Sequence, residues 1–306
     1  MHGRLYNELV LEIAISPRTP LIIKSGEKAG IDPARPDMEF VRTTRRNAHG
    51  EPEDTLYIPG SSLRGVLRAH AERLLRSLRD DLACQITDQS CIKRKDLKES
   101  EISGARAYRE ACYACRLFGN TAIASRLQIG DLYPHRELEP LTETRYGVAI
   151  DRVTGAVAVG PFQMETVTSA LFLGRLVLRN FTVGQLGLLG AALLDIADGL
   201  VALGHAKSRG LGRVRLNFNW ARFRFMQLPP DGNNGIVGIG ALASEEIRRR
   251  YNLPSPDHHA LDGFPQAQHE GLYHTVISRE DADIRRWFET LAPLWVEEIE
   301  QGGISP

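Results

Sequence analysis

Two strand–helix–strand patterns follow one another along this chain, and they constrain its fold more than any other feature. The first has an alternating segment at residues 8–15 (ELVLEIAI), apolar residues at helical spacing over 63–78, and a further strand favoured at 127–133. The second has an alternating segment at 170–180, a Leu- and Ala-rich amphipathic run over 184–204, and a strand from 214 onward. Two β-α-β halves of this kind predict an α+β, ferredoxin-like fold.

The segments between these elements predict insertions on that core. Residues 16–56 are rich in Pro, Gly and charge and favour a long loop, and 127–133 favours a further strand. Residues 145–168 look like two extended arms around a turn at Val153-Thr154-Gly155. Gly204 is typical of a residue that ends the second helix.

The pattern predicts one domain at residues 1–218 and a C-terminal extension at 219–306, to which no motif assigns a role. The extension contains a short helical segment near 244–251 and a final helix near 281–299. At its start, aromatic residues alternate with arginines, which favours an edge strand with one buried face over base stacking. These residues are Trp220, Arg222, Phe223, Arg224 and Phe225.

Charge gives no direct indication of a partner, because Lys+Arg and Asp+Glu are equal at 38 each. The arginines are nevertheless clustered at 42–46 and again at 64–79, so a neutral total can conceal a basic face. No apolar run is long enough to span a bilayer and the N-terminus lacks the features of a signal peptide, which predicts a cytoplasmic protein without a membrane partner.

The cysteines predict a metal site in an insertion at about residues 80–120. All four fall there, as Cys84-x6-Cys91-x20-Cys112-x2-Cys115. A Cys-x2-Cys pair with two further thiolates can hold zinc tetrahedrally, and a metal would stabilise a segment that is short of core residues. Because four thiolates leave no open coordination position, zinc here is expected to be structural, whereas the plainer interpretation is four unrelated thiols.

The segment Ile58-Pro59-Gly60-Ser61-Ser62 is a turn that leads into the first helix. Ser61 or Ser62 is expected to cap this helix, and Arg64 and Arg68 lie one turn apart near its start. The unpaired N–H groups and dipole of such a helix end attract phosphate. An ordinary capped helix with a solvated basic face is the equally open alternative.

The segment from Ala206 to Val214 is a Gly-rich basic turn. Its glycines let the backbone approach a ligand, and its arginines can hold phosphates. It precedes a strand and lacks the Walker A spacing, which argues against a nucleotide-binding P-loop. The alternative interpretation is a plain glycine-rich turn.

Four motifs in this order resemble the RAMP superfamily: IPGSSLRGVLR at 58–68, CRLFGN at 115–120, IDRVTG at 150–155 and SRGLGRV at 208–214. Within that family, the likeness is greatest to the repeated backbone subunit of type III CRISPR effector complexes, which act in antiviral defence. The resemblance covers roughly residues 8–218. The zinc insertion is a departure, because the simplest backbone subunits lack one.

The resemblance implies a modified RRM-like fold and copies that stack along a guide RNA. It implies that 145–168 form a thumb hairpin that interrupts the guide–target duplex. It also implies that guide RNA, target RNA and copies of the chain or paralogous CRISPR subunits are partners. The residues implied to bind the guide backbone are Ser61, Ser62, Arg64, Arg68, Ser208, Arg209, Gly210 and Arg213.

Many such subunits cut target RNA with one loop aspartate upstream of the IPGSS turn. Here the resemblance favours Asp37, with Asp32 as the alternative. A carboxylate can hold Mg²⁺ or another divalent cation, or act as a base for the 2′-OH. Without the resemblance, each aspartate would be interpreted as a turn residue. A non-catalytic backbone subunit and a precursor-guide-RNA processing endonuclease of the same superfamily stay open as alternatives.

Overall fold

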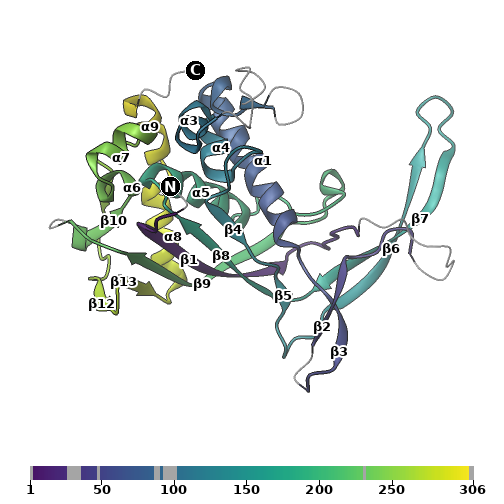
Figure 1. Cartoon of the computed structure of the whole chain (residues 1–306). Helices are drawn as coiled ribbons and strands as arrows, with labels where there is room; N and C mark the ends of the chain where they lie inside the picture. Colours follow the sequence, from purple (N-terminus) through teal and green to yellow (C-terminus); the bar gives the residue numbers. More distant parts are fainter. Residues whose placement is uncertain are drawn as a thin grey trace.

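The sheet at the centre of the molecule is built around the first strand. The computed structural model describes residues 3–25, 36–46, 49–85, 90–91, 102–229 and 232–302. Strand β1 (Asn7–Pro17) lies between β9 (Val214–Phe225) and β8 (Phe172–Arg179) and is antiparallel to both. The sheet continues beyond β8 and β9 at its two edges (Figure 1). The edge strands are β4 (Leu127–Ile129) and β5 (Tyr133–Pro134) beside β8, and β13 (Tyr273–Ser278) and β12 (Gln268–Glu270) beside β9.

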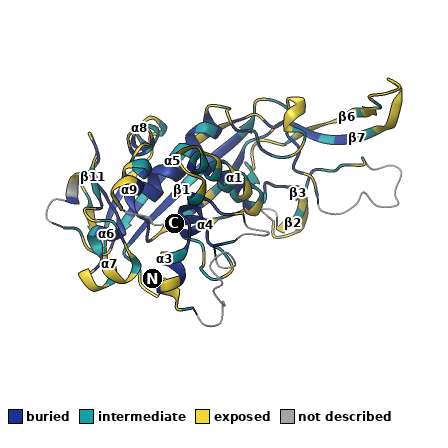
Figure 2. Ribbon diagram, turned by 90° about the horizontal axis from the view of Figure 1, so that it is seen from above, coloured by how far each residue is buried: buried dark blue, intermediate teal, exposed yellow. Residues whose placement is uncertain are grey.

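Three helices cover one face of this sheet: α1 (Gly60–Leu78), α5 (Val183–Ala197) and α8 (Asp281–Leu291). Apolar residues at alternate positions of β1, from Leu9 to Ile15, are buried beneath them. Figure 2 shows this core as a dark band along β1 and α5. The predicted helical and alternating periods therefore mark the two layers of one core.

Shorter elements lie between or beside the strands and helices of this core. They are β2 (Arg42–Arg46), β3 (Pro52–Leu56), η1 (Asp80–Leu82), α3 (Gly104–Glu110), α4 (Tyr113–Phe118), η2 (Lys207–Arg209), η3 (Gly232–Asn234), β10 (Gly235–Val237), α6 (Ile239–Leu242), α7 (Glu245–Tyr251), β11 (His258–Ala260) and α9 (Leu294–Gly302). Within the described residues, no helix combines the length and the apolar character that a membrane span needs.

The predicted pair of extended arms is a projecting hairpin of β6 (Leu141–Ile150) and β7 (Val157–Ser169). It extends well beyond the sheet in Figure 1. Its outer part is exposed on both sides, and only the base of β7, near Met164 and Val167, is buried. The hairpin is longer than the predicted 145–168 because pairing reaches Leu141 and Ser169.

Two helix predictions are wrong, one about where a helix ends and one about its continuity. Helix α5 ends at Ala197, not at Gly204, because Gly199 adopts a left-handed conformation that breaks the helical hydrogen-bond pattern. The final helix is interrupted at Ala292 and Pro293, since proline cannot donate the backbone hydrogen bond that would continue α8.

The boundary predicted at residue 218 falls inside β9. This strand continues to Phe225 and is flanked by β1 and β13, so the prediction of an edge strand at 220–225 is wrong. Phe223 and Phe225 are buried in the core, as the one-sided pattern predicted, while Trp220 lies on the other face. Residues beyond 218 thus share the sheet and the core of the first part.

Candidate metal centre and nucleic-acid interface

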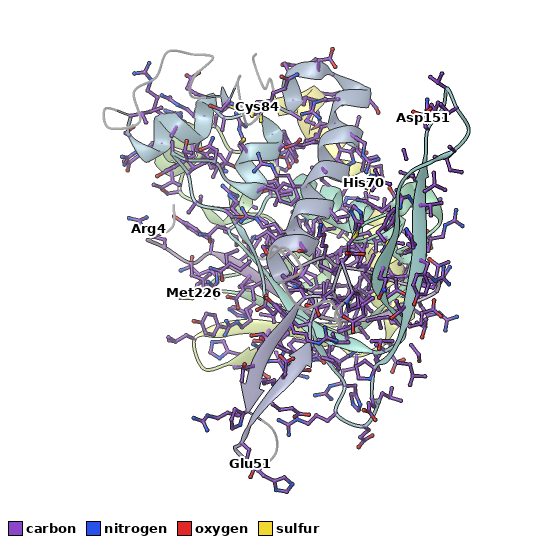
Figure 3. All side chains as sticks on the ribbon, turned by 90° about the vertical axis from the view of Figure 1, so that its right-hand side faces the viewer. Arg4, Glu51, His70, Cys84, Asp151 and Met226 are labelled. Carbon is purple, nitrogen blue, oxygen red and sulfur yellow. The ribbon has the colours of Figure 1, made fainter. Side chains whose placement is uncertain are left out.

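The four cysteines converge beside helix α1. Cys84 follows η1, Cys112 precedes α4 and Cys115 lies within α4, while Cys91 approaches from the intervening segment. All four are buried, and their Sγ atoms lie within 4.8 Å of one another. Figure 3 shows Cys84 near the end of α1 that is far from the β2–β3 hairpin tip at Glu51.

The geometry of this cysteine quartet suits a tetrahedral metal ion. The Sγ atoms of Cys84 and Cys115 are 3.6 Å apart, close to the ~3.8 Å expected when Zn–S bonds of ~2.3 Å meet at tetrahedral angles. Backbone amides of Cys84 and Cys112 point at the Sγ atoms of Cys112 and Cys91, at 3.4 and 3.2 Å. Such donors stabilise negative charge on thiolates, so the quartet could hold a metal ion such as zinc.

Arg64 and Arg68 of α1 are directed at the cysteine-bearing segment from Cys84 to Gly119, here called the metal segment. Arg68 donates to the carbonyl oxygen of Gly119 at 2.9 Å and to Cys115 Sγ at 3.4 Å, while Arg64 donates to the carbonyl oxygen of Phe118. Glu72, one turn later, accepts from Arg68 Nε at 2.8 Å and fixes its guanidinium. Both arginines therefore join α1 to the end of α4, and RNA contact would have to coexist with these bonds.

The start of α1 differs from the prediction, because neither Ser61 nor Ser62 caps it. The helix begins at Gly60, which places both serines inside the first turn. The Gly60 amide donates to the carboxylate of Asp131 at 2.8 Å. A Cβ atom at Gly60 would lie 2.2 Å from the carbonyl oxygen of Ile129, so only glycine fits there. Sequence reasoning missed Asp131, since nothing in its local pattern marks it.

The Gly-rich turn wraps around the chain that follows β1. Gly204 and Gly212 have φ angles of +77° and +83°, and a Cβ at either would clash with a backbone carbonyl. The Gly212 amide donates to the Pro20 carbonyl, and the His205 amide to the Ile22 carbonyl. The predicted phosphate-binding residues of this turn, Ser208, Arg209, Gly210 and Arg213, are all exposed.

The base of the β6–β7 hairpin brings the Asp37 loop and the Gly-rich turn together. A small apolar cluster of Ile22, Met164 and Leu211, with Met38 and Phe162 against it, holds the three segments. Exposed Asp37 accepts a hydrogen bond from the Gln163 amide at 2.7 Å, and the Arg209 guanidinium lies 5.5 Å from the Phe162 ring centroid. The predicted catalyst and a predicted phosphate-binding arginine thus contact adjacent residues of β7.

Arg42 and Glu165 form a second link at the same place. Arg42 Nη1 donates to Glu165 Oε2 at 2.7 Å, and the Phe40 amide donates to the same carboxylate at 3.0 Å. Despite partial burial, these donors lower the pKa of Glu165 below its ordinary value. The arginine cluster at 42–46 was visible in the sequence, but its partner on β7 was not.

Other site predictions have a mixed outcome. Asp32 lies outside the described residues. Among the described residues, the cysteine quartet is the one cluster of His, Cys, Asp or Glu side chains that could hold a metal ion. Within the same residues, Asp37 belongs to no such cluster. The structure therefore joins Asp37 to the Gly-rich turn but directs Arg64 and Arg68 toward the metal segment.

Two carboxylates from the C-terminal part meet the N-terminus of α5. Buried Asp257 accepts from the amides of Val183 and Gly240 at 2.8 and 2.7 Å. Glu298 accepts from the Gly184 amide at 2.9 Å and from the Tyr113 hydroxyl at 3.2 Å. Burial, together with repulsion from Glu298, raises the pKa of Asp257 to about 8. Since Tyr113 lies between two of the cysteines, this contact connects the metal segment to α9.

Comparison with known proteins gives a clear family match. A family model described as RAMPs, the RAMP superfamily, matches residues 15–215, well over half of the chain. The matched region runs from β1 into β9 and contains the metal segment, the hairpin and the Gly-rich turn. No curated protein matches the chain.

Proposed function

Because the chain belongs to the RAMP superfamily, we propose that it is a guide-RNA-binding backbone subunit of a type III CRISPR ribonucleoprotein effector. Family membership supports a CRISPR-associated role in RNA binding. The finer assignment draws on the projecting β6–β7 hairpin as the thumb and on the basic Gly-rich turn at its base. Copies of the chain or paralogous subunits would then stack along one guide.

The core is proposed to be a modified ferredoxin-like, RRM-like fold. In this proposal, β1, α1, β4, β8, α5 and β9 are its elements in chain order. Their spatial order in the sheet, β9-β1-β8-β4, supports the assignment, because it is antiparallel throughout with the first strand in the interior. The β2–β3 hairpin, the cysteine segment and β6–β7 are then insertions between these elements.

The proximity of Asp37 to the Gly-rich turn carries the proposal of RNA cleavage. With Arg209 on Phe162 and Asp37 on Gln163, a backbone phosphate held by the turn would lie near the carboxylate. Asp37 would act on the 2′-OH or help to hold a divalent cation such as Mg²⁺. Since no described cluster of protein ligands surrounds Asp37, phosphate oxygens and water would complete the coordination of such a cation.

The cysteine quartet is proposed to hold a structural zinc ion. When bound, zinc would fix the segment that precedes β4 and the carbonyl oxygens that accept from Arg64 and Arg68. The role of these two arginines, with Ser61 and Ser62, in guide binding remains part of the proposal. It requires the remaining donors of the guanidinium groups to contact phosphate.

The test uses the full chain assembled with its guide and partner subunits. The wild type is expected to carry RNA of uniform length and to cut complementary target RNA. Asp37→Ala should keep the guide and lose cutting, while Asp262→Ala, at an exposed site, should cut normally. Cutting by Asp37→Ala would exclude Asp37 as the catalyst. A wild type that binds but never cuts would indicate a non-catalytic backbone, and cleavage of repeat RNA by the isolated chain would indicate a processing enzyme.

A further inference from the structure

The face of the sheet opposite the helices carries a row of arginines that the proposed function does not use. Along β9, residues at alternate positions are buried in the core, and those between them project from the other face. A bulge opposite Glu12 and Ile13 keeps this alternation in phase with β1 and leaves Trp220 on the open side. The open-face residues of β9 are Arg215, Asn217, Trp220, Arg222 and Arg224.

Strand β8 adds two arginines to the same face. Glu8 of β1 lies directly between Arg179 and Arg224, and Glu12 lies between Arg175 and Trp220. We define the arginine face as Arg175, Arg179, Arg215, Trp220, Arg222 and Arg224. Its five arginines stand against two glutamates, Glu8 and Glu12, so it is positive although the chain as a whole is neutral.

Both glutamates accept hydrogen bonds from arginines, and Arg175 keeps N–H donors that can contact a ligand. Arg179 Nε and Arg224 Nε donate to opposite oxygens of buried Glu8, at 2.7 and 2.9 Å. Arg175 donates through Nε to Glu12 at 2.9 Å, and its side chain is 63% exposed. A guanidinium has five N–H donors, so this single bond through Nε leaves the Nη atoms of Arg175 able to contact a phosphate.

Trp220 provides a flat surface within this positive strip. The guanidinium groups of Arg175 and Arg222 lie 5.2 and 6.0 Å from its ring. An indole ring with guanidinium groups beside it is a surface on which unpaired bases stack, whatever their sequence. The strip begins immediately after Arg209 and Arg213 of the Gly-rich turn and follows β9 for about 30 Å.

We propose that the arginine face binds single-stranded RNA as a continuation of the surface formed by the Gly-rich turn. Phosphates contact Arg175, Arg215 and Arg222, and a base stacks on Trp220. This inference rests on the proposed function, because it takes the Gly-rich turn as the place where the RNA backbone enters. It adds a second contact surface that lies on a face of the sheet rather than at its edge.

The experiment measures binding of a labelled single-stranded RNA of about 20 nucleotides to the full chain, freed of co-purified RNA, by fluorescence anisotropy over a series of salt concentrations. The test variant is Arg175→Gln/Arg215→Gln/Arg222→Gln, which spares the arginines that cover Glu8. The control is Arg248→Gln/Arg249→Gln/Arg250→Gln on α7, which changes the net charge equally.

The test variant should bind at least ~10-fold more weakly at low salt. The slope of log affinity against log salt should become shallower by about 2, because each phosphate that a cation neutralises on a single strand adds ~0.7 to it. The control should stay within about twofold of the wild type. As an independent readout, ultraviolet crosslinking of the wild type should label the peptide that contains Trp220.

Equal affinity and slope in the test and control variants would overturn this inference, as would crosslinks that avoid Trp220. A change in self-association with unchanged RNA binding would assign the face to contact between subunits and would also overturn it. The proposed function fails separately, when the wild type itself binds no RNA or when Arg209→Gln/Arg213→Gln leaves binding unchanged.

Discussion

The Nη2 atom of Arg68 donates a hydrogen bond to the Sγ atom of Cys115 at 3.4 Å, and this contact joins helix α1 to the cysteine quartet. The same guanidinium contacts the Gly119 carbonyl and the Glu72 carboxylate. Folding of the metal segment and orientation of α1 are therefore linked. Arg68, which the sequence suggested as a phosphate ligand, thus has hydrogen-bond partners inside the protein.

If the quartet holds zinc as proposed, removal of the metal is expected to unfold the segment around it. Four thiolates without their ion repel one another or become protonated in a buried place, so a chelator should lower the melting temperature by several degrees. Elemental analysis should give one zinc per chain for the wild type and a large loss for Cys112→Ser. Full retention of metal by Cys112→Ser would contradict the assignment.

Arg68→Ala is expected to reduce stability whether or not RNA is present. The change removes charged hydrogen bonds to Gly119, Cys115 and Glu72, which should cost about 2–3 kcal/mol of unfolding free energy. Urea unfolding of the RNA-free chain measures this loss. Arg73→Ala, an exposed position on the same helix, is the matched control and should change the unfolding free energy by less than ~0.5 kcal/mol.

Gly212→Ala is expected to distort the Gly-rich turn, while Gly210→Ala should be tolerated better. Both glycines have left-handed φ angles, which cost a non-glycine residue ~1–2 kcal/mol. At Gly212 the added Cβ would also lie 2.0 Å from the Leu203 carbonyl oxygen, whereas Gly210 has open space. Thermal unfolding and RNA affinity should both suffer more in Gly212→Ala, and equal effects would contradict this account of the turn.

Stability is expected to fall as the pH rises from about 4 toward 9. Burial raises the pKa of Asp257 from its ordinary 3.8 to about 8, and it also raises the pKa of Glu298. A raised carboxyl pKa contributes stability that is complete below the ordinary value and is lost as the pH passes the folded-state value. Urea unfolding at pH 5, 7 and 9 should show a loss of at least ~1 kcal/mol.

Glu298→Gln should flatten this pH dependence, because it removes the charge that repels Asp257 and keeps an oxygen for the Gly184 amide. Glu297→Gln, an exposed neighbour on α9, should leave the dependence unchanged. Identical pH profiles for Glu298→Gln and the wild type would show that the two carboxylates do not interact.

Truncation after residue 218 is expected to prevent folding of the remaining chain. It would cut β9 in its middle, remove β13 and expose the core side of α5 by deleting α8. Apolar residues such as Phe218, whose ring packs edge-to-face against Phe288, would be left without their partners. A soluble, cooperatively unfolding fragment of residues 1–218 would contradict this prediction.

Local periodicity determined much of the fold. The alternating segment at 8–15 and the helical spacing at 63–78 show which side of each element is apolar. In the structure, those apolar sides are the buried ones. The cysteine quartet was also predictable, because four thiols confined to one polar segment have few alternatives to a common centre. These inferences need only neighbours along the chain.

Only the tertiary structure decided the hydrogen-bond partners of the polar residues. Asp37 meets the Gln163 amide across 126 positions, and Gly60 meets Asp131 across 71, contacts on which no periodic pattern bears. Arg64 and Arg68 lie on the polar side of α1, as their spacing indicates, yet that side faces the end of α4. A sequence shows which side chains need a partner, whereas the partner is fixed by how separate elements pack, because hydrogen bonds and ion pairs form only between atoms that folding brings within about 3 Å.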